Sequence, residues 1–277
     1  MAIDKDLILK LRGLSHAGFA DCKKALEETN NDIQEAIKWL RKKGIAKATD
    51  KYALKDAKEG GTWVKKDENG IALIELNSET DFVANSEGFG TLANSIVNTI
   101  LENKVDDLEA VKNLKLSSGE SVSESCLHLS SITGEKIVLN RVKYVSVSAE
   151  ETASCYRHTN GRISALLIFD KKFDEDLAFK LAVHYAANSP KFITADQVDE
   201  RWVASEKEII LALLEKENKP AEYRDNIIEQ RLKKTILKET LMEQDFLYDT
   251  SKKIKDVLKE LGASIKIAMF FALGESR

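Results

Sequence analysis

The chain has 277 residues and a mass of 31.0 kDa, and its 42 Lys and Arg against 46 Asp and Glu give a net charge of −4. Hydrophobic residues make up 43%, which is enough for real cores, whereas 13 Gly and 2 Pro exclude collagen-like and proline-rich classes. At ~100–200 residues per domain, the length predicts two or three domains. The near-neutral charge argues against broad wrapping of nucleic acid, so no direct nucleic-acid partner is expected.

The sequence shows no pattern of a membrane segment or of an oxidising compartment. Residues 1–6 contain two acids and no apolar run, so we expect neither a secretory nor a transit segment, and a cytoplasmic location. The late apolar run 267–273 has seven residues, against the ~20 that a membrane helix needs, so no membrane partner is expected. Cys22, Cys126 and Cys155 are too few and too scattered for a disulfide framework or a zinc site.

The first part of the chain, residues 1–45, is predicted to be a small three-helix module. Apolar residues recur at helical spacing in three stripes: Leu7, Ile8, Leu11; Cys22, Ala25, Leu26; and Ile33, Ala36, Ile37, Leu40. Asn31 is the expected N-cap of the third helix, and Gly44 lies where a helix-ending glycine belongs. Residues 46–61 lose the apolar period and are rich in lysine, which indicates a linker.

The remainder predicts an α+β core in two parts, residues 62–148 and residues 149–277. Each part has an Asn-Gly turn signal, at 69–70 and at 160–161, that is followed by an apolar strand and then by a helix. This order indicates a duplicated hairpin–helix unit. The second part also contains an inserted antiparallel helical hairpin, at about 196–246, with a break at the proline of Asn218-Lys219-Pro220.

Motifs for catalysis are absent from the sequence. Neither the phosphate-binding loops G-x-x-x-x-G-K-[ST] and G-x-G-x-x-G nor the H-E-x-x-H and G-x-S-x-G motifs occur. The four histidines have no paired ligand nearby, and Cys155 and His158 are three apart in a predicted strand, so they face opposite sides. We therefore expect no catalytic residue, no metal ligand and no cofactor.

One short segment, Thr80-Asp81-Phe82-Val83-Ala84, is not explained by composition. It follows a predicted buried strand, where a chain normally turns at the surface. In one interpretation Thr80 or Asp81 caps a short helix and Phe82 packs into the core. In the other, Phe82 is an exposed aromatic anchor for a protein partner.

This segment resembles the signature of the elongation factor Ts family, the guanine-nucleotide exchange factors of elongation factor Tu. Five stretches carry the resemblance over nearly the whole chain and in the family's order: residues 11–26, 76–84, 161–163, 184–190 and 241–249. The first of them is similar to the family's ubiquitin-associated-like (UBA-like) N-terminal module. The resemblance implies a protein without a cofactor that binds elongation factor Tu in its GDP-bound and nucleotide-free forms, disturbs its Mg²⁺/phosphate site and promotes GDP release.

The resemblance also implies residue roles. Phe82 would wedge between helices of the partner and Asp81 would help to disturb its Mg²⁺ site, while Thr80 and Val83 would hold the loop in shape. Further partner-binding residues would be Arg12, Lys23, Lys24 and His184. Without the resemblance, Lys23 and Lys24 indicate only a solvated helix face. For His184, whose neighbours on its helix face are leucines, a satisfied core histidine is an equally good interpretation.

Two other functions remain open from the sequence. One is a ribosome-associated RNA-binding accessory protein, because a lysine-rich linker would suit RNA. The other is an adaptor that recognises a ubiquitin-like protein, which the N-terminal bundle alone suggests and which leaves residues 62–277 unexplained.

Overall fold

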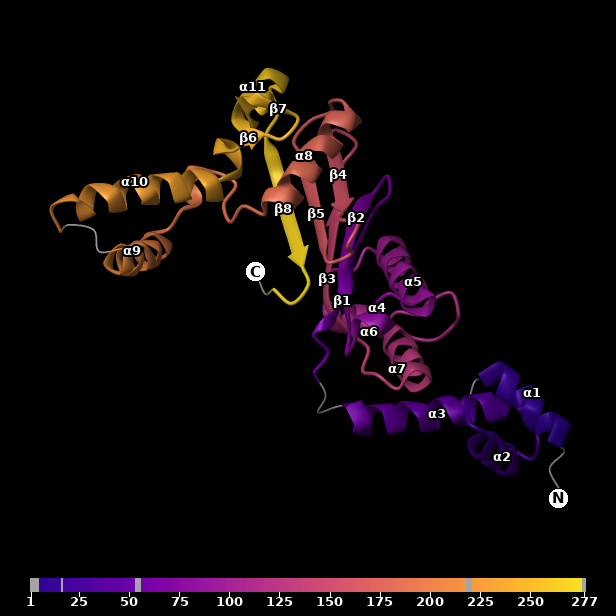
Figure 1. Cartoon of the computed structure of the whole chain (residues 1–277). Coiled ribbons are helices and arrows are strands. Elements are labelled where there is room, and N and C mark those ends of the chain that lie inside the picture. Colours follow the sequence, from indigo (N-terminus) through magenta and orange to yellow (C-terminus); the bar gives the residue numbers. More distant parts are fainter. Residues whose placement is uncertain (1–4, 16, 53–55, 218–220, 276–277) are drawn as a thin grey trace. The chain divides into compact units, whose positions relative to one another are not determined.

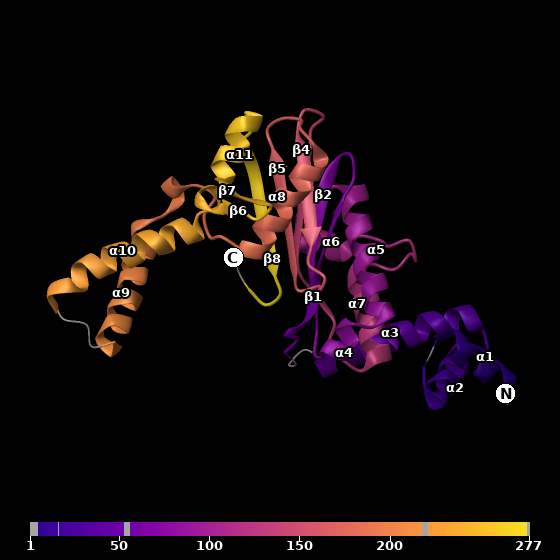
Figure 2. The same cartoon turned by 45° about the horizontal axis from the view of Figure 1, so that its top comes forward.

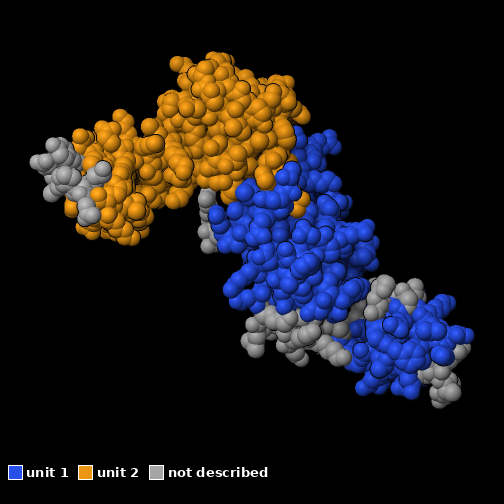
Figure 3. Space-filling view, in the orientation of Figure 1, with its two compact units in different colours: residues 1–146, 159–163, 271–277 blue, residues 147–158, 164–270 orange. Residues whose placement is uncertain are grey.

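The computed structural model (Figure 1) describes residues 5–15, 17–52, 56–217 and 221–275, in which helices and strands are mixed, as predicted for an α+β protein. The chain divides into two compact units (Figure 3). Unit 1 comprises residues 1–146, 159–163 and 271–277, and unit 2 comprises residues 147–158 and 164–270. Within the described residues, no helix combines the length and the apolar character that crossing a membrane requires.

Unit 1 begins with three helices, α1 (Lys5–Ser15), α2 (Phe19–Glu28) and α3 (Ile33–Tyr52). Their predicted apolar stripes form one small core, which confirms the three-helix expectation. The buried members are Ile8, Leu11, Cys22, Ala25, Leu26 and Ala36.

The boundaries of the third helix differ from those predicted. Gly44 does not end α3, which continues to Tyr52 through the first part of the predicted linker. A glycine inside a helix costs only ~1 kcal/mol relative to alanine, and the alanines and lysines that follow it are good helix formers. Residues 53–55 of the predicted linker lie outside the described residues.

The N-cap of α3 is Asp32, and not Asn31 as predicted. Oδ1 of Asp32 accepts a hydrogen bond from the amide of Glu35 at 3.0 Å, and its carbonyl accepts from Ala36 at 2.8 Å. Asn31 instead has a φ of +64°, a left-handed conformation that asparagine tolerates better than most residues.

The first sheet contains three antiparallel strands in the order β1 (Glu59–Lys66), β2 (Gly70–Ser78), β3 (Val138–Ser146). The predicted turn joins β1 and β2, and Oδ1 of Asp67 accepts from the amides of Asn69 and Gly70 at 2.8 Å each. Gly70 is required by close approach, since a Cβ there would lie 2.6 Å from the ring of Tyr144.

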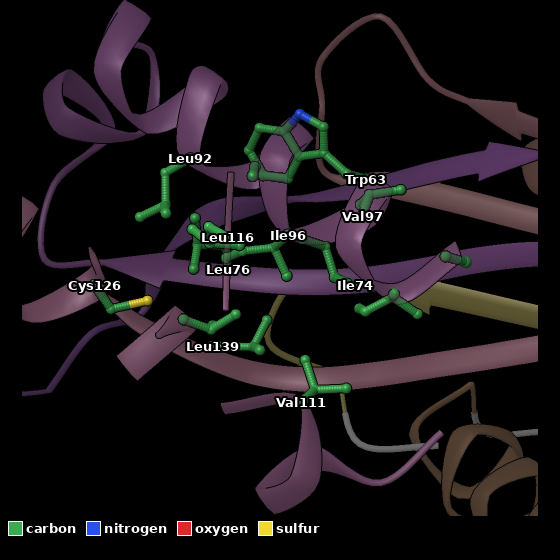
Figure 4. Close-up of a cluster of buried hydrophobic side chains, with 14 of the residues drawn as sticks. Trp63, Ile74, Leu76, Leu92, Ile96, Val97, Val111, Leu116, Cys126 and Leu139 are labelled. Carbon is green, nitrogen blue, oxygen red and sulfur yellow. The ribbon is translucent and has the colours of Figure 1, made fainter. Parts of the chain in front are cut away.

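Four helices follow β2 before the chain returns as β3: α4 (Asp81–Ala84), α5 (Glu87–Asn103), α6 (Leu108–Asn113) and α7 (Val122–Thr133). The apolar face of α5 lies against the β1–β2 hairpin (Figure 1 and Figure 2). Trp63, Ile74 and Leu76 from the sheet gather there with Ile96 and Val97 from α5 (Figure 4). Burial of each such side chain stabilises the fold by ~1.5–3 kcal/mol. The cluster therefore stabilises the sheet, and the sheet positions the loops at the ends of its strands.

Unit 2 repeats the order of elements. The second sheet, which lies in unit 2 except for Ile163 and residues 271–272, has the strands β4 (Thr152–Arg157), β5 (Ile163–Phe169) and β8 (Ile265–Ala272) in the order β4-β5-β8. The helix α8 (Glu175–Asn188) packs on β4. In both sheets a hairpin is joined by a strand from much later in the chain, which pairs beside the second strand of the hairpin. The predicted repetition of hairpin and helix is therefore present and extends to a third strand.

The elements between α8 and β8 include the predicted helical pair, α9 (Glu200–Lys216) and α10 (Ala221–Glu239). The pair has a small core of Ile210, Leu214 and Leu232 and a bidentate ion pair of Arg231 with Glu217. The predicted break at residues 218–220 lies outside the described residues. The other elements are η1 (Ala195–Gln197), η2 (Leu241–Glu243), β6 (Asp245–Phe246), β7 (Asp249–Lys253) and α11 (Ile254–Leu261).

Candidate functional site

The segment that composition did not explain forms a tight turn at the end of the central strand β2. Thr80 is the N-cap of α4: its Oγ1 accepts from the amide of Val83 at 3.4 Å, and its carbonyl accepts from Ala84 at 3.2 Å. Ser86 then caps α5 and donates its hydroxyl to the carbonyl of Val83 at 2.7 Å. Two helix starts thus follow one another within a few residues, which fixes the backbone on both sides of Phe82.

A second loop, between α7 and β3, braces this turn. The carboxylate of Glu135 accepts two hydrogen bonds from Thr80, one from the amide at 3.0 Å and one from Oγ1 at 2.7 Å. In the opposite direction, Oε1 of Glu79 accepts from the amide of Lys136 at 2.6 Å. The two loops therefore hold one another through three hydrogen bonds that involve carboxylates, a type that is roughly twice as strong as a neutral pair.

Phe82 projects from this turn with 85% of its surface exposed, more than any other large hydrophobic side chain in the described residues. Its neighbour Val83, by contrast, is partly buried and packs against the core cluster of unit 1. Asp81 is exposed beside Phe82. Of the two interpretations of Phe82, the exposed aromatic is the one that the structure shows, and the core aromatic is wrong.

The predicted basic residues lie elsewhere in unit 1, on the helical module. Arg12 is exposed on the last turn of α1, and Lys23 and Lys24 are exposed on α2. Lys23 is 3.9 Å from Glu27 one turn along the helix, an exposed pair of a kind that contributes little to stability. These charges are therefore available to a partner at small energetic cost.

His184 lies on α8 in unit 2 and is 1% exposed. The amide of Leu247 donates to Nδ1 at 3.2 Å, so Nδ1 is an acceptor and Nε2 donates to Oε1 of Gln244 at 2.9 Å. Burial lowers the pKa of His184, and the hydrogen bond with Gln244 opposes this shift only in part. His184 is therefore a satisfied, neutral core histidine, which is the interpretation that its leucine neighbours suggested.

Because its ring is buried, His184 cannot contact a partner directly in this conformation. A role in partner binding stays a prediction and would be indirect, through the exposed residues whose position His184 fixes. The ring packs on Phe246 and fixes the start of the turn between β6 and β7, where Leu247 is 52% exposed and Tyr248 is 49% exposed. The structure thus gathers four predicted site residues on the Thr80–Val83 turn and leaves the other four on α1, α2 and α8.

Sequence reasoning missed Glu135 as a partner of the Thr80 turn. No local pattern identifies it, because 55 residues separate it from Thr80 and only the pairing of β3 with β2 brings the two loops together. In the described part of the chain, His, Cys, Asp and Glu form no group of three or more that could hold a metal ion.

Comparison with known proteins agrees with this arrangement. Residues 79–275, which include the braced turn, match the family model described as elongation factor TS. The chain is 38% identical over 275 residues to an elongation factor Ts of Mycoplasmoides gallisepticum and 36% identical over 276 residues to one of Malacoplasma penetrans. Each match covers 99% of this chain and 94% of the relative. The chain belongs to the elongation factor Ts family of translation elongation, whose members are nucleotide exchange factors and not enzymes.

Proposed function

We propose that this protein binds elongation factor Tu and accelerates the release of its GDP. The observation that carries the proposal is the 85% exposure of Phe82 on a turn whose backbone is fixed by caps and by Glu135. Keeping a large aromatic in water forgoes the ~1.5–3 kcal/mol that its burial would contribute to folding. A protein–protein contact recovers that energy, and buried aromatics commonly dominate such contacts.

The mechanism is thermodynamic linkage. A GTPase holds GDP through phosphate contacts and a Mg²⁺ ion that bridges phosphate and protein oxygens. A protein that binds the nucleotide-free form more tightly than the GDP form weakens GDP binding by the same factor. A shift over four decades requires ~5.5 kcal/mol of differential binding, which an inserted aromatic together with a broad interface supplies.

The residues of the Thr80–Val83 turn have different roles in GDP release. Phe82 inserts between helices of the partner, and the carboxylate of Asp81 beside it disturbs the Mg²⁺ site. Val83 anchors the turn in the core of unit 1, and Thr80 holds it through its cap and its bonds to Glu135.

Contacts away from the turn supply affinity. Lys23 and Lys24 contact the nucleotide-binding domain of the partner, and Arg12 is a further partner-binding residue. In unit 2, His184 orders the β6–β7 turn, so that Leu247 and Tyr248 present an apolar contact to a second domain of the partner.

The test is the release of fluorescent GDP from elongation factor Tu, followed with and without this protein over a concentration series. We expect a rate that rises with protein concentration to a plateau, and a lower plateau for Phe82→Ala. The matched control is Ile209→Ala on α9, because Ile209 is also an exposed large apolar residue, at 51%, and lies outside the turn. A release rate that does not depend on this protein would refute the proposal.

The RNA-binding alternative makes a different prediction. It requires tight, steeply salt-dependent affinity for RNA in the absence of elongation factor Tu. Measuring RNA binding and GDP release on the same preparation therefore separates the two functions.

A further inference from the structure

We propose that Glu135 is a positioning residue for exchange, which holds the Thr80–Val83 turn in the conformation that presents Phe82. This inference rests on the proposed function and deepens it. Glu135 lies on a different loop from the turn, and its carboxylate bonds both the amide and the hydroxyl of Thr80.

The turn needs such support because α4 is very short. It has four residues, Asp81–Ala84, and a single helical turn is not stable by itself in water. None of its residues is fully buried, so packing alone does not fix it. Two interactions hold it: Val83 packs against the core cluster of unit 1, and Glu135 accepts hydrogen bonds from Thr80.

Thr80 links this support to the position of Phe82. Its hydroxyl donates to Oε1 of Glu135 and accepts from the amide of Val83, so the carboxylate also sets the direction of the capping oxygen. Phe82 lies between these two bonded residues. Loss of Glu135 removes two of the hydrogen bonds of Thr80 and leaves its cap on Val83, so it loosens the N-terminal end of α4 and increases the number of backbone conformations around Phe82.

A rigid turn favours exchange because its backbone is already ordered before the partner binds. The conformational entropy of the turn is then not lost on binding, and the full binding free energy of Phe82 acts on the partner. With a loosened turn, part of the binding energy of Phe82 is spent on ordering its own backbone. We therefore expect the saturating rate of GDP release to fall about tenfold or more in Glu135→Ala. The half-saturating concentration depends mainly on the remaining interface and should change less than threefold.

The experiment compares Glu135→Ala and Glu135→Gln with a matched control, Asp107→Ala. Oδ1 of Asp107 accepts from the amide of Ala110 at the start of α6, so the control also removes a carboxylate from a helix start in unit 1. Glu135→Gln should retain at least half of the saturating rate, because its amide oxygen can accept from the Thr80 amide while its nitrogen donates to the Thr80 hydroxyl. Asp107→Ala should lower the melting temperature about as much as Glu135→Ala and leave the saturating rate unchanged.

A double-mutant cycle isolates the route through Phe82. If Glu135 acts only by presenting Phe82, Glu135→Ala has no further effect on the saturating rate of Phe82→Ala. An additional tenfold loss in that background would overturn the inference, because Glu135 would then act by another route. Equal losses in Glu135→Gln and Glu135→Ala would also overturn it and indicate that the charge contacts the partner directly.

Failure of the inference is distinguishable from failure of the proposed function. If the unmodified protein does not accelerate GDP release, the proposed function is wrong. If it does, and Phe82→Ala is impaired while Glu135→Ala is not, only the positioning role is wrong.

Discussion

The guanidinium of Arg141 on β3 lies against the fully buried carboxylate of Glu75 on β2, with its Nε donating to Oε2 at 2.6 Å. The same guanidinium donates to the carbonyl of Ala272 at 2.6 Å and stacks over the ring of Phe271 at 4.2 Å from its centroid. On its other oxygen, Glu75 accepts from the amide of Gly274 at 3.1 Å. One buried ion pair thus attaches residues 271–274 to the first sheet, within unit 1.

Breaking this pair is expected to destabilise unit 1 strongly. Arg141→Met leaves a buried carboxylate without its countercharge, which should lower the free energy of unfolding by ~3–5 kcal/mol in a urea titration. The double variant Arg141→Met/Glu75→Gln removes both charges and should recover much of that loss. A loss below ~1 kcal/mol in the single variant would show that the ion pair does not stabilise the sheet.

Phe82→Ala should affect exchange and leave folding almost unchanged. Because the side chain is 85% exposed, the free energy of unfolding should change by no more than ~0.5 kcal/mol. The saturating rate of GDP release should fall by tenfold or more. A stability loss of ~3–5 kcal/mol, as for a core Phe→Ala, would contradict the exposed position.

His184 should make stability depend on pH. The folded state keeps the imidazole neutral with a pKa below its ordinary value, whereas the unfolded state binds a proton near pH ~6.5. The unfolded state therefore binds more protons below pH ~6.5, and the free energy of unfolding falls as the pH drops from there toward the folded pKa.

In His184→Gln this contribution is absent, so its unfolding free energy should fall less steeply over that pH window. At pH 7 the variant should also be ~1–3 kcal/mol less stable, since Gln cannot reproduce the bonds to both Leu247 and Gln244. Thermal melts at several pH values measure both effects. Parallel pH profiles for the two proteins would show that His184 is not the titrating group.

Lys23 and Lys24 should contribute to affinity and not to stability. Replacing both with Ala should weaken binding of elongation factor Tu several-fold at low ionic strength, because exposed charges act mainly by electrostatic steering. The difference from the unmodified protein should shrink at 0.5 M salt, given a Debye length of ~10 Å at 0.1 M. An unchanged affinity at low salt would exclude these lysines from the interface.

Cys126 should be inert in the folded protein. Its burial raises the pKa of the thiol to about 12, so at pH 8 the thiolate fraction is on the order of one in ten thousand. Iodoacetamide should leave Cys126 unmodified in the native state and modify it in guanidinium chloride, as read by mass spectrometry. Rapid native labelling of Cys126 would mean that α7 opens readily.

The features that the sequence predicted correctly are local ones. The turn signal at 69–70 located the first hairpin, and the helix expected after its second strand is present as α5, because side-chain spacing and turn chemistry act within a few residues. The end of α3 was predicted wrongly because a single glycine does not outweigh the good helix formers after it. Nor could the pattern decide between Asn31 and Asp32, since adjacent residues have the same capping chemistry.

For the candidate site, the sequence identified the Thr80–Val83 turn but not Glu135, which accepts two hydrogen bonds from Thr80. Phe82 was assignable to the surface only with the family resemblance, because pattern alone favoured a place in the core, where most large aromatic side chains lie. The contacts of Glu135 with Thr80 and of Leu247 with His184 depend on tertiary pairing across 55 and 63 residues. Such pairs lie beyond the reach of periodicity in one sequence.

The attachment of residues 271–274 to the first sheet has a consequence for protein synthesis. Glu75 is synthesised about 200 residues before Gly274, and Arg141, the later of the two, about 130 residues before it. At roughly 5–20 residues per second, about 7–26 s therefore pass between the synthesis of Arg141 and that of the segment that completes the hydrogen bonds of the buried carboxylate. During that interval unit 2 is translated, so the part of the chain that begins to form first is the last to be finished.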